Sequence, residues 1–123
     1  MYINEDKTEL PYPITAYDEQ SITVGNLILR NSFILSPKLM ITETVPQVFD
    51  ELTQEHLAPL LELNPELLII GTGHHSKQIS GLMRYFLESK GIGVECMNTP
   101  AACRSYTVLL SEGRNMAAVF FIK

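Results

Sequence analysis

The stretch "IIGTGHHSKQ" (residues 69–78) gathers several side chains that could do chemistry. An apolar run ends at Gly71, Gly73 follows one residue later, and two histidines, a serine and a lysine come next. A glycine-rich loop that opens a helix can cradle a phosphate, and histidine is a common metal ligand. The same pattern also suits a plain turn between a strand and a helix.

The two nucleotide-binding motifs do not fit this loop. A dinucleotide fingerprint that begins at Gly71 needs a third glycine at Ser76. A P-loop that begins at Gly73 needs a glycine–lysine pair, but Gln78 and Ile79 occupy those positions. We therefore expect no nucleotide and no other cofactor.

Metal and nucleophile chemistry are disfavoured by residue spacing. His74 and His75 are adjacent, whereas metal-binding helices separate their ligands by three or four residues. His56, Cys96 and Cys103 show no ligand spacing either. The chain has no G-x-S-x-G elbow, and Cys103 falls inside an expected helix, away from the first turn that stabilises a thiolate. We expect no metal and no catalytic residue, and two reduced thiols in or near a core.

The second half of the chain alternates between strand and helix patterns. A continuous apolar run over 66–70 predicts a buried strand. Apolar residues spaced i, i+3, i+4 predict a helix that ends at Gly91; they are Ile79, Leu82, Met83, Phe86 and Leu87. Residues 92–97 form the next strand, Thr99 and Pro100 start a second helix that ends before Gly113, and 116–122 close the chain as a strand.

The first half carries strand signals between residues 14 and 48. Gly25-Asn26 is a strong turn dipeptide between two short apolar stretches. We predict a meander of three or four short strands, preceded by an N-terminal arm over 1–13. The fold prediction is thus one α/β domain over 14–123, a three-layer sandwich with a mixed, mostly parallel central sheet and an N-terminal β meander layer.

One position in this fold suits a ligand. The parallel strands 66–70 and 92–97 should place the loops "GTGHHS" and "MNTPAA" side by side at their carboxyl ends, where open α/β sheets bind ligands. The amides at the start of the second helix carry partial positive charge, and Arg104 follows in the next turn. The crevice could hold a small anion or the carboxylate of a partner. Alternatively, Thr99 caps the helix and Arg104 makes a surface ion pair.

The composition excludes several classes of partner. The formal net charge is −5, whereas non-specific binding to nucleic acid or anionic lipid needs a basic surface. The N-terminus lacks a basic region followed by an apolar run, and no apolar run is long enough to span a bilayer. We expect a cytoplasmic protein without nucleic-acid binding or membrane insertion. The oligomeric state stays open, with a homodimer as one alternative.

Three segments carry a resemblance to a known family. They are "LTQEHLAPLLELNPELLIIGTG", "GIGVECMNTPAACRSYTVLLSEGR" and "AAVFF", with Gly71-Thr72-Gly73, Ala101–Arg104 with Tyr106, and Glu112–Arg114 as the most specific parts. The chain resembles a small family of unknown function that includes the adipogenesis-associated Mth-type domain protein and mitochondrial NADH:ubiquinone oxidoreductase assembly factor three. Asn98 stands where the family pattern has an acidic residue.

The resemblance implies a three-layer α/β fold with one antiparallel strand in its sheet, and a role in building respiratory complex I. Our first hypothesis is a non-catalytic factor that binds proteins, either respiratory-complex subunits or assembly machinery. The alternative is a small enzyme or sensor with an anion in the Gly71–Ser76/Thr99–Arg104 crevice. A third hypothesis is that the glycines serve only turns and close packing. The candidate ligand- or partner-binding residues are Gly71, Thr72, Gly73, Thr99, Ala101, Arg104 and Tyr106.

Overall fold

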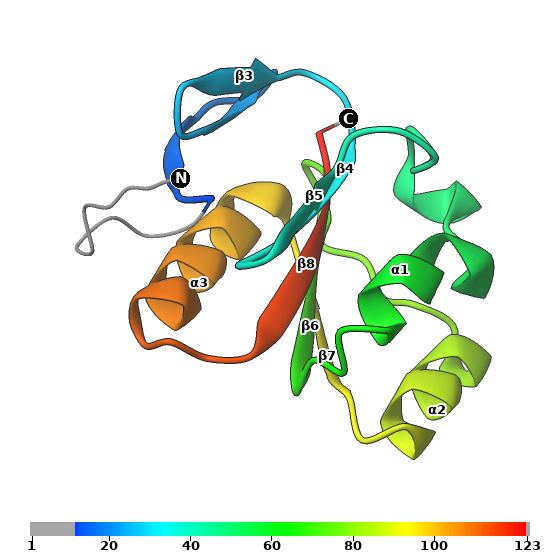
Figure 1. Cartoon of the computed structure of the whole chain (residues 1–123). Helices are drawn as coiled ribbons and strands as arrows, with labels where there is room; N and C mark the ends of the chain where they lie inside the picture. Colours follow the sequence, from blue (N-terminus) through cyan, green and yellow to red (C-terminus); the bar gives the residue numbers. More distant parts are fainter. Residues whose placement is uncertain (1–11, 123) are drawn as a thin grey trace.

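A five-stranded sheet forms the centre of the computed structural model, which describes residues 12–122 (Figure 1). The strand order is β5-β4-β8-β6-β7. β6 pairs in parallel with β7 and β8, whereas β4 is antiparallel to both β5 and β8. The strands are β4 (Phe33–Ser36), β5 (Leu39–Ile41), β6 (Leu67–Thr72), β7 (Gly93–Met97) and β8 (Met116–Phe121).

This topology confirms the α/β class and corrects one detail of the prediction. The sheet is mixed, with two parallel and two antiparallel pairings, and is not mostly parallel. The reason is that a tight hairpin from the first half of the chain joins the sheet as β4 and β5, and strands joined by a tight turn pair antiparallel.

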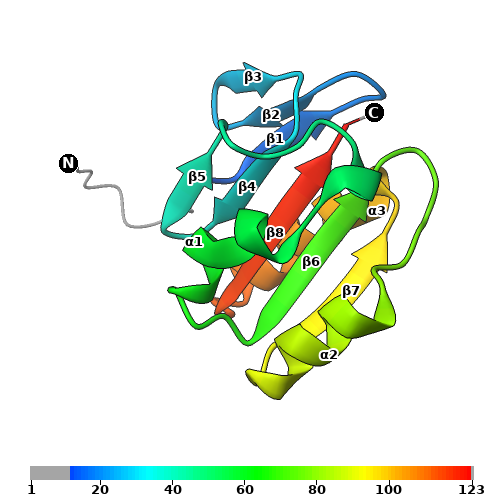
Figure 2. The same ribbon diagram turned by 90° about the vertical axis from the view of Figure 1, so that its right-hand side faces the viewer.

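Helices cover both faces of the central sheet (Figures 1 and 2). α3 (Thr99–Ser111) lies on one face. α1 (Ala58–Leu61) and α2 (Gly81–Ser89) lie on the other, with the short 3-10 turns Phe49–Glu51 and Gln54–Leu57. The arrangement gives the predicted three layers.

A separate three-stranded antiparallel sheet packs beside α3. It consists of β1 (Ile14–Tyr17), β2 (Ile22–Val24) and β3 (Leu27–Leu29). The predicted turn at Gly25-Asn26 joins β2 to β3, and the φ of +61° at Gly25 is one that glycine adopts without strain. The N-terminal β layer is therefore confirmed, although the five strands of the first half divide between two sheets.

The core lies on both faces of β6 and β8. Ile69, Ala118 and Phe120 pack toward α3 and the small sheet. Ile70 and Phe121 pack toward α1 and α2. Both strands are buried on both faces, which explains why they read as continuous apolar runs instead of alternating patterns.

The start of α2 differs from the prediction. Ser80 is the N-cap, and its hydroxyl accepts a hydrogen bond from the Met83 N–H at 3.1 Å. The helix therefore begins two residues after Ile79. Its inward stripe consists of the buried Leu87 and the partly buried Met83 and Phe86. Leu82 was predicted to belong to this stripe, but its side chain is 73% exposed.

The predicted N-terminal arm falls mostly outside the described residues. Of positions 1–13, only Tyr12 and Pro13 are described, and the Tyr12 carbonyl accepts a hydrogen bond from the Tyr106 hydroxyl at 3.1 Å. Within residues 12–122, no helix has the length and apolar character needed to cross a membrane.

Candidate functional site

The two loops expected to form a crevice do meet. β6 and β7 run side by side with Gly71 opposite Met97. Beyond the strands, the Thr99 N–H donates to the Gly73 carbonyl at 2.9 Å, and the Gly73 N–H donates to the Thr99 hydroxyl at 2.8 Å. These reciprocal bonds fix the β6 loop against the start of α3.

Thr99 connects three elements, and it does not cap the helix as predicted. Its hydroxyl, which accepts from Gly73, also donates to the Phe121 carbonyl at the end of β8. The N-cap is Asn98, whose side-chain oxygen accepts from the Ala101 N–H at 2.9 Å. Asparagine and aspartate are both good N-caps, so Asn98 serves the same purpose as the acidic residue expected there.

The amides at the start of α3 are all used within the protein. Thr99 N–H bonds Gly73, Ala101 N–H bonds the Asn98 side chain, and Ala102 N–H bonds the Asn98 carbonyl. Pro100 has no N–H to offer. The amides whose partial positive charge was expected to attract an anion are therefore occupied by partners within the chain.

Arg104 and Tyr106 make their side-chain hydrogen bonds to the N-terminal part of the chain and not to the two loops. The Arg104 guanidinium donates to the Tyr17 hydroxyl at 3.2 Å and lines a groove of about 500 Å³ between β1 and α3. Tyr106 is fully buried, and its ring packs edge-on against Phe120 at a centroid distance of 6.0 Å. Burial raises the pKa of the Tyr106 phenol. The anionic-ligand alternative is accordingly not favoured.

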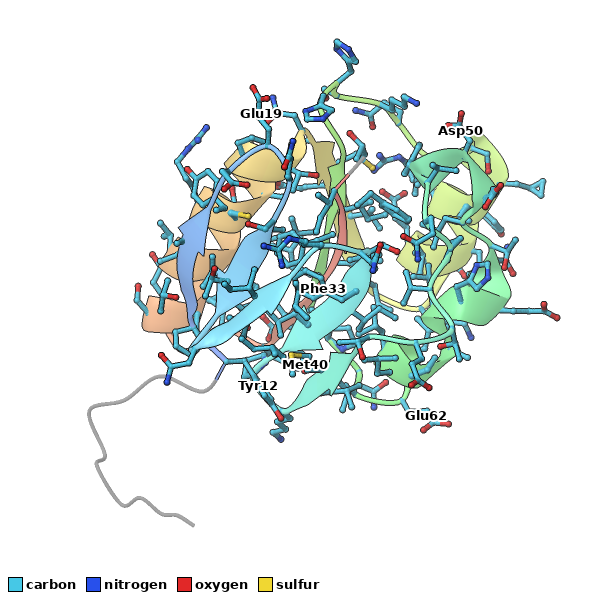
Figure 3. All side chains as sticks on the ribbon, turned by 90° about the horizontal axis from the view of Figure 1, so that it is seen from above. Tyr12, Glu19, Phe33, Met40, Asp50 and Glu62 are labelled. Carbon is cyan, nitrogen blue, oxygen red and sulfur yellow. The ribbon has the colours of Figure 1, made fainter. Side chains whose placement is uncertain are left out.

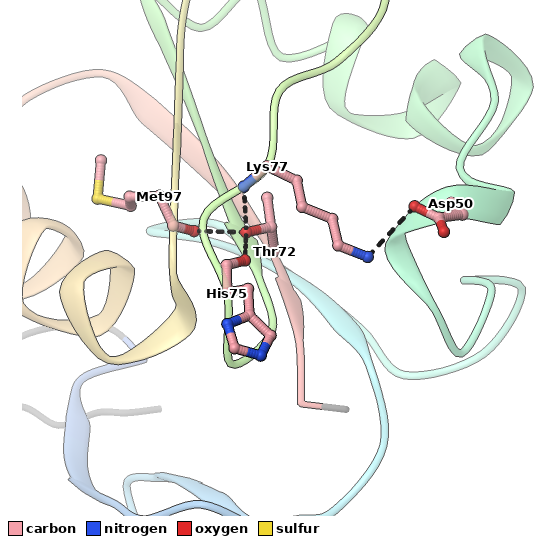
Figure 4. A network of polar contacts seen from close by, with 5 residues as sticks. All are labelled: Asp50, Thr72, His75, Lys77 and Met97. Carbon is pink, nitrogen blue, oxygen red and sulfur yellow. Dashed lines mark hydrogen bonds and ion pairs between the residues drawn. The ribbon is translucent and has the colours of Figure 1, made fainter.

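The Thr72 hydroxyl holds together the loop that follows β6, over Gly73–Lys77 (Figure 4). The Thr72 hydroxyl lies 2.6 Å from the His75 carbonyl and 3.2 Å from the Met97 carbonyl, and it accepts from the Lys77 N–H at 3.1 Å. The Lys77 side chain reaches the Asp50 carboxylate at 3.5 Å. The loop is thus folded around one buried hydroxyl, while the His75 side chain is exposed.

A pocket of about 240 Å³ remains where these loops meet the β1–β2 turn. Of the seven predicted site residues, Gly73 and Thr99 line it. Ala101 is half-buried outside its lining, and the binding role of the seven stays a prediction. His74 and Pro100, which belong to the two predicted loops, also line the pocket. Sequence reasoning missed the rest of the lining, which comes largely from the first half of the chain: Tyr17, Asp18, Glu19, Ile22 and Ile122.

The two cysteines are free thiols, as predicted, and Cys103 is fully buried on α3. Loss of solvation raises the pKa of the Cys103 thiol to about 12, although the nearby Arg104 charge opposes the shift.

This pKa predicts a loss of stability at alkaline pH. Above about pH 9 the unfolded chain loses the Cys103 proton that the native state keeps, so the free energy of unfolding falls by about 1.4 kcal/mol per pH unit up to pH 12. Urea denaturation between pH 8 and pH 11 measures the slope. Cys103→Ala should flatten it, leaving the contribution that Tyr106 makes at higher pH. An unchanged slope in this variant would contradict the assignment.

The chain is similar to proteins in several organisms. NADH dehydrogenase (ubiquinone) 1 alpha subcomplex assembly factor 3 of Mus musculus is 27% identical over 84% of this chain and 58% of its own length. This chain spans 55% to 63% of five such assembly factors. The 13 kDa major membrane protein of Francisella tularensis is 26% identical, with 97% of this chain and 98% of the relative covered.

Solved structures share the fold over nearly the whole chain. A protein of Xanthomonas campestris is 32% identical with a TM-score of 0.83, covering 99% of this chain and 92% of its own. Residues 14–121 match the family described as "Protein of unknown function (DUF498/DUF598)". The chain therefore belongs to the DUF498/DUF598 family.

Proposed function

We propose that the chain is a non-catalytic, protein-binding factor of the cytoplasm that assists the assembly of respiratory complex I. The observation that carries the proposal is the similarity of 82% to 94% of this chain to five animal proteins named as complex I assembly factor 3. The matched part includes the α/β domain, so a shared function has to be performed by its surface.

The outer face of α2 supports a protein-binding role. Leu82 is 73% exposed and Tyr85 is 75% exposed, more than any other large apolar side chain of the described residues. The two are three positions apart and lie on one side of the helix. Exposed apolar side chains that lie together are typical of contact surfaces, and tyrosine is enriched among residues that dominate binding.

A deletion strain tests the proposal. In cells of the source organism, removal of the gene should lower the amount of assembled complex I on native gels and the NADH:ubiquinone reductase activity of membranes. The wild-type gene should restore both. Normal levels of assembled complex I in the deletion strain would overturn the proposed function.

Two variants test the surface. Leu82→Ser/Tyr85→Ser should fail to restore complex I, although the fold is preserved because both side chains are exposed. The matched control is Val108→Ser on α3, which removes a 53% exposed apolar side chain from the opposite face of the sheet. Full rescue by the double variant would exclude the α2 face as the contact surface.

A further inference from the structure

The pocket beside Thr99 is lined by apolar side chains and by two acidic residues of the β1–β2 turn. Ile22 is 1% exposed and Ile122 is 6% exposed, and both line the pocket together with Pro100. Asp18 and Glu19 contribute carboxylates from the β1–β2 turn, and Figure 3 shows Glu19 at the periphery of the molecule. A ligand that fits this lining has an apolar stem and a positive end.

The negative charge of Asp18 and Glu19 is not neutralised by an ion pair with another described residue. One oxygen of the Asp18 carboxylate accepts hydrogen bonds from the Gln20 and Ser21 N–H groups at 2.8 Å each and from the Ser21 hydroxyl at 3.2 Å. These bonds, together with the positive charge of Arg30, lower the pKa of Asp18 and favour its ionised form. The nearby Arg30 lines the adjoining hollow with Glu19, so the net charge of these three side chains is negative.

The backbone amides beside the pocket are not free to bind an anion. The Gly73 N–H donates to the Thr99 hydroxyl and the Thr99 N–H donates to the Gly73 carbonyl. The Arg104 guanidinium donates to the hydroxyl of Tyr17, which lines the pocket. Lysine and arginine characteristically lay their aliphatic stems on apolar surface while the charged head stays near water. A volume of about 240 Å³ is below the range of sites for drug-sized ligands, and it suits a single side chain.

We propose that this pocket receives an arginine side chain presented by a protein partner, with the stem against Ile22 and Ile122 and the guanidinium at the carboxylates of Asp18 and Glu19. Arginine is the favoured occupant because its guanidinium is weakly hydrated and carries several donors for two carboxylates. The inference rests on the proposed protein-binding function, and it names one chemical feature of the partner.

Titration of the ¹⁵N-labelled protein with the capped peptide acetyl-Ala-Arg-Ala-amide tests the pocket directly. Saturable shifts are expected at the amides of Ile22, Gly73 and Ile122. The matching citrulline peptide, which is neutral, should bind about tenfold more weakly, and the glutamate peptide weaker still. Absence of saturable shifts, or equal affinity for the citrulline or glutamate peptide, would overturn the proposal.

Neutral variants of the two acidic residues test whether their charge contributes to binding. Asp18→Asn/Glu19→Gln keeps an acceptor oxygen in the β1–β2 turn and should weaken arginine-peptide binding about three- to tenfold, the scale of exposed ion pairs. Glu62→Gln, at the residue that follows α1 and far from Glu19 in Figure 3, should leave the affinity unchanged. Equal affinity of the double variant and wild type would overturn the pocket assignment alone. The amount of complex I in the deletion strain decides the proposed function separately.

Discussion

Replacement of Thr99 by valine is expected to lower the free energy of unfolding by about 2–4 kcal/mol. Valine has the shape of threonine but cannot hydrogen-bond, so the substitution leaves the Gly73 N–H and the Phe121 carbonyl without their partner. All three residues are buried, and each unpaired buried group costs about 1–3 kcal/mol. Urea denaturation at pH 7 measures the change.

Thr99→Ser is the matched control. Serine keeps the hydroxyl and loses only a methyl group, so its cost should be about 1 kcal/mol. The valine variant should also alter the amide shifts of residues around the pocket, because Thr99 holds the β6 loop to the start of α3. Equal stability of the serine and valine variants would show that the hydroxyl is not the connecting group.

The sequence predicted the elements well where the pattern is local. The buried strand β6, the turn at Gly25-Asn26 and the C-terminal ends of α2 and α3 each depend on a few neighbouring residues. The pairing of β4 with β8 joins segments more than eighty residues apart, such as Phe33 and Phe120. Such pairing depends on the whole fold, and local patterns do not encode it, so the sheet was expected to be more parallel than it is.

The prediction of the site from local patterns was limited in the same way. Proximity of the Gly73 and Thr99 loops followed from the parallel strands that precede them. The pocket, however, is completed by the β1–β2 turn, whose acidic residues Asp18 and Glu19 led us to propose a cationic ligand instead of an anion. Periodicity and motif spacing describe segments one at a time, so they do not reveal which turn covers which crevice.

Several residues that carry the family resemblance have packing roles in this chain. Thr72 and Thr99 hold the loop by hydrogen bonds, and Tyr106 belongs to the core. Gly71 allows α3 to approach β6, because a Cβ at this position would lie 3.0 Å from the Ala102 Cβ and 3.2 Å from the Thr99 Cα. The resemblance therefore follows the α3–β6 contact, which the proposed pocket borders at Gly73 and Thr99, while Leu82 and Tyr85 on α2 lie outside it.

Gly71→Val is expected to lower the free energy of unfolding by about 3 kcal/mol or more, at the upper end of the range for overpacked cores. The valine Cβ would meet the backbone of Thr99, which cannot rotate away, so α3 has to shift from the sheet. Gly71→Ala should cost about 1–2 kcal/mol for the same reason. Gly93→Ala is the control, since its Cβ would contact Leu67 at an ordinary 3.5 Å. Urea denaturation of the four proteins gives the order; equal stability of the Gly71→Ala and Gly93→Ala variants would contradict the close approach of α3.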